Sequence, residues 1–208
     1  TESEVLFQTT EVSFELLDSA GTTDIGGGTE YYAGGWRQFG SGTTKTTMEL
    51  LPVSYAFRVS YAGATQQKSN INVGTDPSVV FQTREVTFKL LDSKGSEIAG
   101  GAEYYASGWK TFGGGTTTTT MELLPVKYAF RVSYGGSSQQ MNDIDVGVNP
   151  VVVFQTGEVI IHYADCSLRY YNTGWHDYTG PIEMLPVSTL FEFRGSGYPN
   201  AQIYITPI

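Results

Sequence analysis

Three glutamates recur at one equivalent position, and a carboxylate is the usual acid or base of hydrolytic chemistry. They are Glu49, Glu122 and Glu183, and each stands three residues before a proline. Acid–base cleavage of one bond needs two such groups close together, on either side of that bond. Because each repeat carries one of them, they cannot converge, and we interpret them as charges that guard a sheet edge.

Repeated aromatic residues indicate a second kind of chemistry, the stacking of sugar rings on aromatic faces. The members of this set are Tyr31, Tyr32, Trp36, Tyr104, Tyr105, Trp109, Tyr170, Tyr171 and Trp175. The alternative role is packing, because a sandwich of roughly 70 residues without a disulfide needs bulky residues at its centre. Recurrence in all three repeats favours packing, and a glycan platform stays open as the alternative.

The chain contains the residue types of a nucleophilic catalytic site, a cysteine with histidines and an aspartate. Cys166 follows Asp165, and the two histidines of the chain, His162 and His176, lie in the same third of it. No oxyanion motif accompanies them, so Cys166 is interpreted as a small buried hydrophobe. The sequence therefore predicts a protein that is not an enzyme, with no catalytic residues, no cofactor and no metal.

Two further patterns leave alternatives open. Acidic residues in Gly-rich loops suggest calcium, but no complete ligand set is visible; they are Asp18, Asp24, Asp92 and Glu97. Threonine runs at 43–47 and 116–120 fit edge strands and also fit O-glycan acceptors.

The elements that must position these residues come in three tandem copies. The phrase FQT occurs at 7–9, 81–83 and 154–156, and MELLPV at 48–53 returns at 121–126. These anchors predict a first extended strand at 1–9, which is a possible donor strand, and repeats at 10–83, 84–156 and 157–208. The third repeat is the shortest.

Within a repeat the hydrophobic period is two, as in EVTFKLL at 85–91. Turn sequences such as FGGG and YGGSS separate six or seven such segments, and no helical segment is visible. The predicted fold is all-β, with three tandem antiparallel β-sandwich domains of an immunoglobulin-like or prealbumin-like type.

Composition excludes several partners. The 208 residues carry a net charge of −9, and their 12 basic residues are scattered, which argues against binding to nucleic acid or anionic lipid. No apolar run is long enough to span a membrane.

The order of VTFKLLDSKG, AEYYASGWKTF and MELLPVKYAFRVSY resembles the Cna-B or prealbumin-like sandwiches of bacterial surface proteins. The resemblance covers most of the first two repeats and the third from Leu168 onward. It implies a surface protein, and in some relatives an internal Lys–Asn or Lys–Asp crosslink beside a buried acid. The positional candidates in this chain are Lys89, Asp145 and Glu122, but Lys89 lies on the polar phase of its strand, which favours a solvated role.

The FQT phrase also predicts assembly. Aligning the repeats leaves the third without a counterpart of VVVFQT, whereas an extra copy stands at the front of the chain. The intersubunit strand would be Val5, Leu6, Phe7, Gln8 and Thr9, and the acceptor end would be Ile203, Tyr204 and Ile205. We therefore expect an extracellular cell-surface structural protein, a filament subunit or adhesin stalk that assembles head to tail with itself. The alternative is a carbohydrate-binding module that contacts surface glycans.

Overall fold

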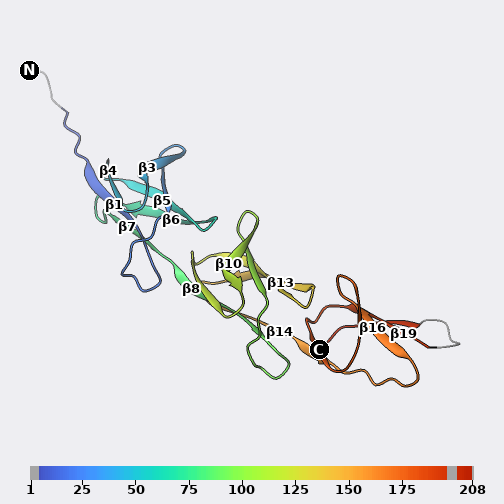
Figure 1. The fold of residues 1–208 in the computed structure, drawn as a ribbon. Coiled ribbons are helices and arrows are strands. Elements are labelled where there is room, and N and C mark those ends of the chain that lie inside the picture. The colour runs from blue at the N-terminus through green and yellow to red at the C-terminus, as the bar shows by residue number, and fades with distance from the viewer. Residues whose placement is uncertain (1–4, 196–200, 208) are drawn as a thin grey trace, which may run out of the picture. The chain divides into compact units, whose positions relative to one another are not determined.

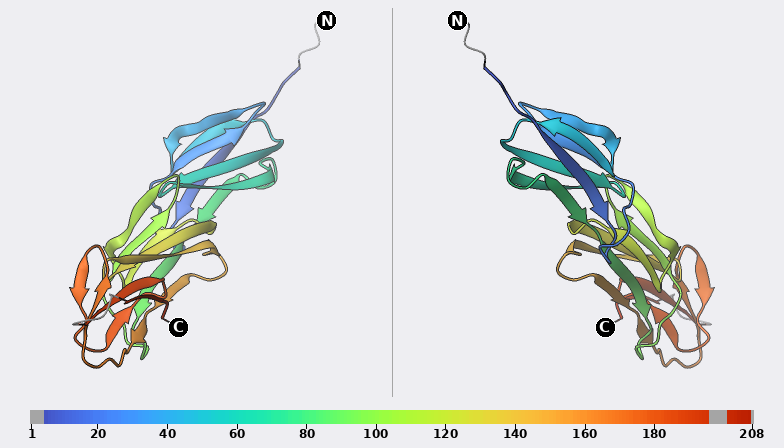
Figure 2. Two further views of the ribbon diagram at one scale, coloured as in Figure 1. Left: turned by 90° about the vertical axis from the view of Figure 1, so that its right-hand side faces the viewer. Right: turned by 90° about the vertical axis from the view of Figure 1, so that its left-hand side faces the viewer.

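The computed structural model describes residues 5–195 and 201–207, and every regular element within them is a β-strand (Figures 1 and 2). The all-β prediction is confirmed, and six sheets form three repeated two-sheet units. Over these residues no helix exists that could cross a membrane.

Contacts divide the chain into two compact units. Unit 1 contains the residues up to Val86 together with Glu122–Lys127 and Asp145–Pro150. Unit 2 contains Thr87–Met121, Tyr128–Ile144 and the residues from Val151 onward. Segments of the second repeat thus belong to both units.

Repeat 1 is built from two sheets, one with the order β4-β1-β7 and one with the order β3-β2-β5-β6. The strands are β1 Thr10–Leu17, β2 Gly28–Tyr32, β3 Trp36–Thr43, β4 Thr46–Leu50, β5 Ser54–Tyr61, β6 Ala64–Asn72 and β7 Ser78–Gln82. Alternate residues of β1 point inward, and Val12, Phe14 and Leu16 are buried. They meet Phe39, Phe57 and Phe81 in one aromatic core, in which Phe14 and Phe81 stack at 5.3 Å between ring centroids.

One strand pairing differs from the antiparallel arrangement that we expected. β7 runs parallel to β1, with Val79 opposite Phe14 and Phe81 opposite Leu16. The physical reason is the route of the chain: β6 belongs to the other sheet, so the chain must cross back before β7, and such a crossover permits parallel pairing. The FQT phrase is therefore the last strand of a sandwich, placed beside its first.

Repeat 2 follows the same plan, with the sheets β11-β8-β14 and β10-β9-β12-β13. The strands are β8 Arg84–Leu91, β9 Gly101–Tyr105, β10 Trp109–Thr116, β11 Thr119–Leu123, β12 Lys127–Tyr134, β13 Ser137–Asp145 and β14 Val151–Gln155. β14 is parallel to β8, and Phe154 stacks on Phe88 at 5.4 Å. Gly100 is needed here because a Cβ would lie 2.8 Å from Leu90 Cδ2 and 2.9 Å from a backbone oxygen of β12.

Repeat 3 is reduced. Its sheets are β15-β18 and β17-β16-β19-β20, from β15 Gly157–Val159, β16 Ser167–Tyr171, β17 Trp175–Asp177, β18 Ile182–Met184, β19 Thr189–Arg194 and β20 Ala201–Ile205. Its core contains Val159, Leu168, Tyr178, Met184 and Phe191. Among the described residues, no strand lies beside β15 where β7 and β14 lie beside β1 and β8.

Candidate functional site

The recurring glutamate forms a side-chain cluster where one repeat passes into the next. Glu122, near the end of β11, accepts hydrogen bonds from Ser19 N at 3.2 Å and from Ser19 Oγ at 2.5 Å. The same carboxylate accepts a hydrogen bond from Thr83, the threonine of the FQT phrase. We call this arrangement of Glu, Ser and Thr the carboxylate joint, and all three residues belong to unit 1.

A second carboxylate joint lies within unit 2. Glu183 of β18 accepts hydrogen bonds from Ser93 N at 3.1 Å, from Ser93 Oγ, and from Thr156 Oγ1 at 2.5 Å. Burial raises the pKa of Glu183, but the hydrogen bonds from Ser93 and Thr156 outweigh it and leave the pKa below its usual value. The carboxylate is therefore ionised at neutral pH and binds three donors.

Each residue of the FQT phrase has a separate structural task. The phenylalanine enters the core, and the threonine donates to the joint. The glutamine amide donates to the loop after the first strand: Gln82 Nε2 to Ser19 O at 3.0 Å, and Gln155 Nε2 to Asp92 O at 3.2 Å. The phrase thus completes one sandwich and links it to the next.

The three glutamates lie on the edge strands β4, β11 and β18, as expected of charges that guard a sheet edge, but that expectation was incomplete for Glu122 and Glu183. It overlooked hydroxyl donors that lie far away in sequence, since Ser19 and Glu122 are 103 residues apart. Glu49 occupies the same position in repeat 1, on β4 opposite Glu11, and its side chain is exposed. Glu49 is thus the member of the set that lacks the Ser and Thr neighbours in the structure described.

The first copy of the FQT phrase, at 7–9, lies outside any sheet. Residues 5–9 leave β1 as an extended segment (Figures 1 and 2), with Val5 74% and Phe7 78% exposed. Their counterparts in repeat 1, Val79 and Phe81, are 2% and 1% exposed. The rest of the predicted 1–9 strand, residues 1–4, lies outside the described residues.

The segment that follows β15 has the complementary deficiency. In β1 and β8 the second half of the strand pairs with the FQT strand, over Ser13–Leu17 and Thr87–Leu91. The equivalent residues of repeat 3 are 160–164, and no strand forms there. Ile160 is 52% exposed and Tyr163 is 40% exposed. Residues 160–164 therefore hold the position that pairs with the FQT strand in the other repeats, without that neighbour among the described residues, and we call them the open segment.

Tyr178 occupies the other side of the open segment. Its hydroxyl accepts a hydrogen bond from Ile161 N at 2.8 Å and donates to Val159 O at 3.2 Å. In repeat 1 the corresponding residues of β1, Phe14 and Val12, pair with β4 on this side. The hydroxyl thus bonds to Ile161, which the shorter β18 does not reach. Among the described residues, no strand pairs with the open segment on the side that faces β7 in repeat 1.

The residues that the sequence predicts as the acceptor end lie in a different sheet from the FQT strand. Ile203, Tyr204 and Ile205 belong to β20, which pairs with β19 at the edge of the four-stranded sheet. In repeats 1 and 2 that place belongs to β6 and β13, and not to the FQT strand. The structural counterpart of the FQT acceptor is the open segment.

The aromatic set divides between core and surface. Tyr104 is buried and Tyr31 packs on the core, whereas Tyr32, Tyr105 and Tyr171 are exposed. The tryptophans are not at the sandwich centre, which phenylalanines fill instead. Each tryptophan has an arginine guanidinium over one ring face, at 4.2 Å for Trp36 and Trp109 and 4.0 Å for Trp175. A glycan platform would have to use the opposite face.

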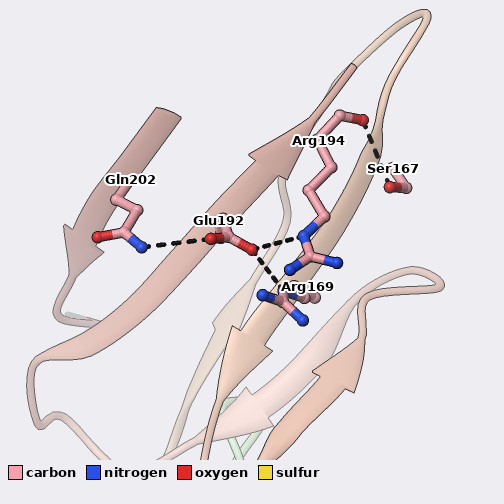
Figure 3. A network of polar contacts seen from close by, with 5 residues as sticks. All are labelled: Ser167, Arg169, Glu192, Arg194 and Gln202. Carbon is pink, nitrogen blue, oxygen red and sulfur yellow. Dashed lines mark hydrogen bonds and ion pairs between the residues drawn. The ribbon is translucent and has the colours of Figure 1, made fainter. Parts of the chain in front are cut away.

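Those arginines are held by glutamates on the neighbouring strand, and repeat 3 exchanges the two charges. Arg58 of β5 donates to Glu30 of β2 at 2.6 Å, whereas in repeat 3 Arg169 of β16 donates to Glu192 of β19 at 2.5 Å. Arg194 and Gln202 also donate to Glu192 (Figure 3). The hydrogen bond from Arg169, opposed by desolvation and assisted by Arg194, lowers the pKa of Glu192 to about 2.

The residues of the predicted crosslink have other partners. Lys89 Nζ lies 2.5 Å from Glu97 Oε1, Asp145 Oδ1 accepts from Gly147 N, and Glu122 belongs to its joint. These contacts agree with a solvated Lys89.

The structure does not assemble the nucleophile set. Cys166 is a free, half-buried thiol, Asp165 and His162 are exposed, and His176 stacks on Tyr170.

Two of the four acidic loop residues, Asp18 and Asp92, bind the backbone of their own turns. Asp18 Oδ1 accepts from Thr22 N and Thr23 N, which lowers its pKa, and Asp92 Oδ1 accepts from Lys94 N and Ser96 N. No group of three or more potential metal ligands occurs within the residues that the structure describes.

No protein-family model matches the chain, and no curated protein matches it significantly.

Proposed function

We propose that the protein is a structural subunit that assembles head to tail by strand donation. Residues 5–9 of one molecule pair in parallel with the open segment of the next. The observation that carries this proposal is the complementary pair of deficiencies: an exposed FQT phrase and an open segment whose equivalents pair with the FQT strand in both other repeats. Because the two surfaces lie on different parts of the chain, the contact is heterologous and propagates into a filament.

The register of the donated strand follows from the internal pairings. Phe81 lies opposite Leu16 and Phe154 lies opposite Leu90, so Phe7 would lie opposite Tyr163. By the same alignment, Val5 would lie opposite Ile161. In this register Val5 and Phe7 point into the core of repeat 3, and Gln8 reaches the Asp165 loop, as Gln155 reaches Asp92.

Burial of the donated side chains supplies the free energy of association. Moving an apolar side chain of this size from water into a core contributes about 1.5–3 kcal/mol, so Val5 and Phe7 contribute about 3–6 kcal/mol before the costs of association. Backbone pairing along the open segment adds to this and fixes the register.

The wider role that we propose is that of an extracellular surface filament or adhesin stalk. The repeated aromatic sandwiches and the acidic, sparsely basic composition support it. Its partner is a second copy of the same chain.

Two variants test strand donation. Phe7→Asp leaves the open segment intact and places a charge in the donated strand. His162→Pro leaves the donor intact and removes an N–H from the open edge, which blocks pairing; His162→Ala is its matched control.

The wild-type chain and His162→Ala are expected to form filaments in electron micrographs and a concentration-dependent series in sedimentation velocity. Each of the two blocking variants alone stays monomeric. A mixture of the two gives a heterodimer that grows no further, because one partner keeps a working donor and the other a working acceptor. Monomers in the mixture, or filaments from Phe7→Asp alone, would overturn the proposal.

A further inference from the structure

We infer that Glu49 is the receiving carboxylate of an intermolecular carboxylate joint, and that its donors are Thr9 of its own chain and the Asp165–Cys166 turn of the molecule that accepts the strand. This inference rests on the proposed strand donation and identifies the second contact of the same interface. In the structure described, Glu49 is exposed.

The internal joints define the expected geometry. In each of them the carboxylate comes from the repeat that follows, the threonine closes the FQT phrase, and the serine follows the first strand of the preceding repeat. For repeat 1, the carboxylate is Glu49 and the threonine is Thr9. The preceding repeat is then repeat 3 of another molecule, in which Cys166 stands where Ser19 and Ser93 stand.

The strand register brings these groups together. When Phe7 lies opposite Tyr163, Thr9 follows the donated strand as Thr156 follows β14, and Thr156 N donates to Leu91 O at 2.9 Å. The residue equivalent to Leu91 is Ala164, and the next two residues are Asp165 and Cys166. The backbone N–H of Cys166 would donate to Glu49 as Ser93 N donates to Glu183 at 3.1 Å.

The thiol of Cys166 sets the strength of the hydrogen bonding in the joint between molecules. An S–H group is a weak hydrogen-bond donor, whereas the hydroxyl found at both internal joints is a strong one. Cys166 therefore makes the joint between molecules weaker than the joints within a molecule. Restoring a hydroxyl with Cys166→Ser should tighten the contact.

The heterodimer of Phe7→Asp and His162→Pro chains tests the inference, because only one glutamate and one cysteine lie at its interface. Glu49→Gln in the His162→Pro chain, which donates the strand, should weaken the heterodimer about tenfold or more. The same substitution in the Phe7→Asp chain should leave the dissociation constant unchanged. The two Glu49→Gln variants are matched controls for each other. In the heterodimer, Glu49 of the Phe7→Asp chain lies away from the interface, at the end where no strand is donated.

Cys166→Ser, combined with Glu49→Gln, completes a double-mutant cycle across the interface. In the accepting chain it should tighten the heterodimer, and this gain should disappear when the donating chain carries Glu49→Gln. In the donating chain it should have no effect. All of the substituted side chains lie at exposed or half-exposed positions, so folding of the variants is checked simply by their circular dichroism.

The outcomes separate the two proposals. If no heterodimer forms, strand donation is wrong and the joint falls with it. If the heterodimer forms but Glu49→Gln acts equally in either chain, strand donation stands and the inference about Glu49 is wrong.

Discussion

Replacing Glu183 by alanine should loosen the contact between repeats 2 and 3, whereas the same replacement of Glu49 should not. The two residues hold equivalent strand positions, so the intrinsic strand preference of alanine cancels between the variants. What differs is the surroundings, because Glu183 accepts three hydrogen bonds and Glu49 is exposed. Both variants are made on a Phe7→Asp background, which keeps the chain monomeric.

The magnitude follows from the hydrogen bonds lost. A hydrogen bond to a charged group contributes about 1.5–3 kcal/mol. The Thr156 hydroxyl retains Leu91 O as an acceptor at 3.4 Å, and water reaches Ser93 because the site is only partly buried, so the three losses are partly compensated. We expect a cost of about 2 kcal/mol for Glu183→Ala, against less than about 0.5 kcal/mol for Glu49→Ala.

Native-state hydrogen exchange measures this difference locally, which avoids the assumption of two-state unfolding in a multi-repeat chain. The Ser93 amide proton should exchange about 10- to 30-fold faster in Glu183→Ala, since about 1.4 kcal/mol corresponds to a factor of ten. The Ser19 amide, in the other joint, is the internal control and should not change. Equal Ser93 exchange rates in the two alanine variants would refute the view that the joint stabilises the contact.

Two further predictions concern repeat 3. Tyr178→Phe, which installs the residue found at positions 39 and 112, should destabilise repeat 3 by about 1–2 kcal/mol in urea unfolding, because Ile161 N and Val159 O lose their partner; an unchanged midpoint would contradict this assignment. Glu192 has a pKa of about 2 when folded, below its usual value of 4.5, so the stabilisation from its ion pairs is complete above about pH 4.5 and is lost as the pH falls through about 2. In thermal melts, repeat 3 of the wild-type chain should weaken over that interval, and Glu192→Gln should remove this part of the pH dependence.

Alternation and repetition predicted the strands and the three sandwich units, because a period of two is a direct consequence of the pleat. They did not predict the parallel pairing of the FQT strand, since the sequence does not show which sheet a strand joins after a crossover. The joints were also missed, although both of their parts recur in the sequence. A Thr closes every FQT phrase and a Glu precedes every Leu-Leu-Pro or Met-Leu-Pro sequence, but their contact is a property of tertiary structure.

The ion pair Glu30–Arg58 of repeat 1 becomes Arg169–Glu192 in repeat 3, and this exchange of charges is visible in the aligned repeats. EYY at 30–32 becomes RYY at 169–171, and the arginine of AFRV at 56–59 becomes the glutamate of LFEF at 190–193. Two compensating changes of sign indicate that the residues face one another on neighbouring strands. The surface position of the tryptophans could not be found this way, since a half-buried indole and a core indole leave the same pattern.

The parallel pairing of β1 with β7 determines how a repeat responds to tension. β1 is where the chain enters the sandwich and β7 is where it leaves, and the two are paired over five residues. A force that pulls the two ends of the repeat apart therefore slides these strands along one another, and it loads their hydrogen bonds together in shear. Forced unfolding depends on the unfolding rate rather than on equilibrium stability, and a shear clamp slows that rate. A donated strand that lies parallel to the open segment would be loaded in the same direction, so the link between two molecules would resist extension in the way that each folded repeat does.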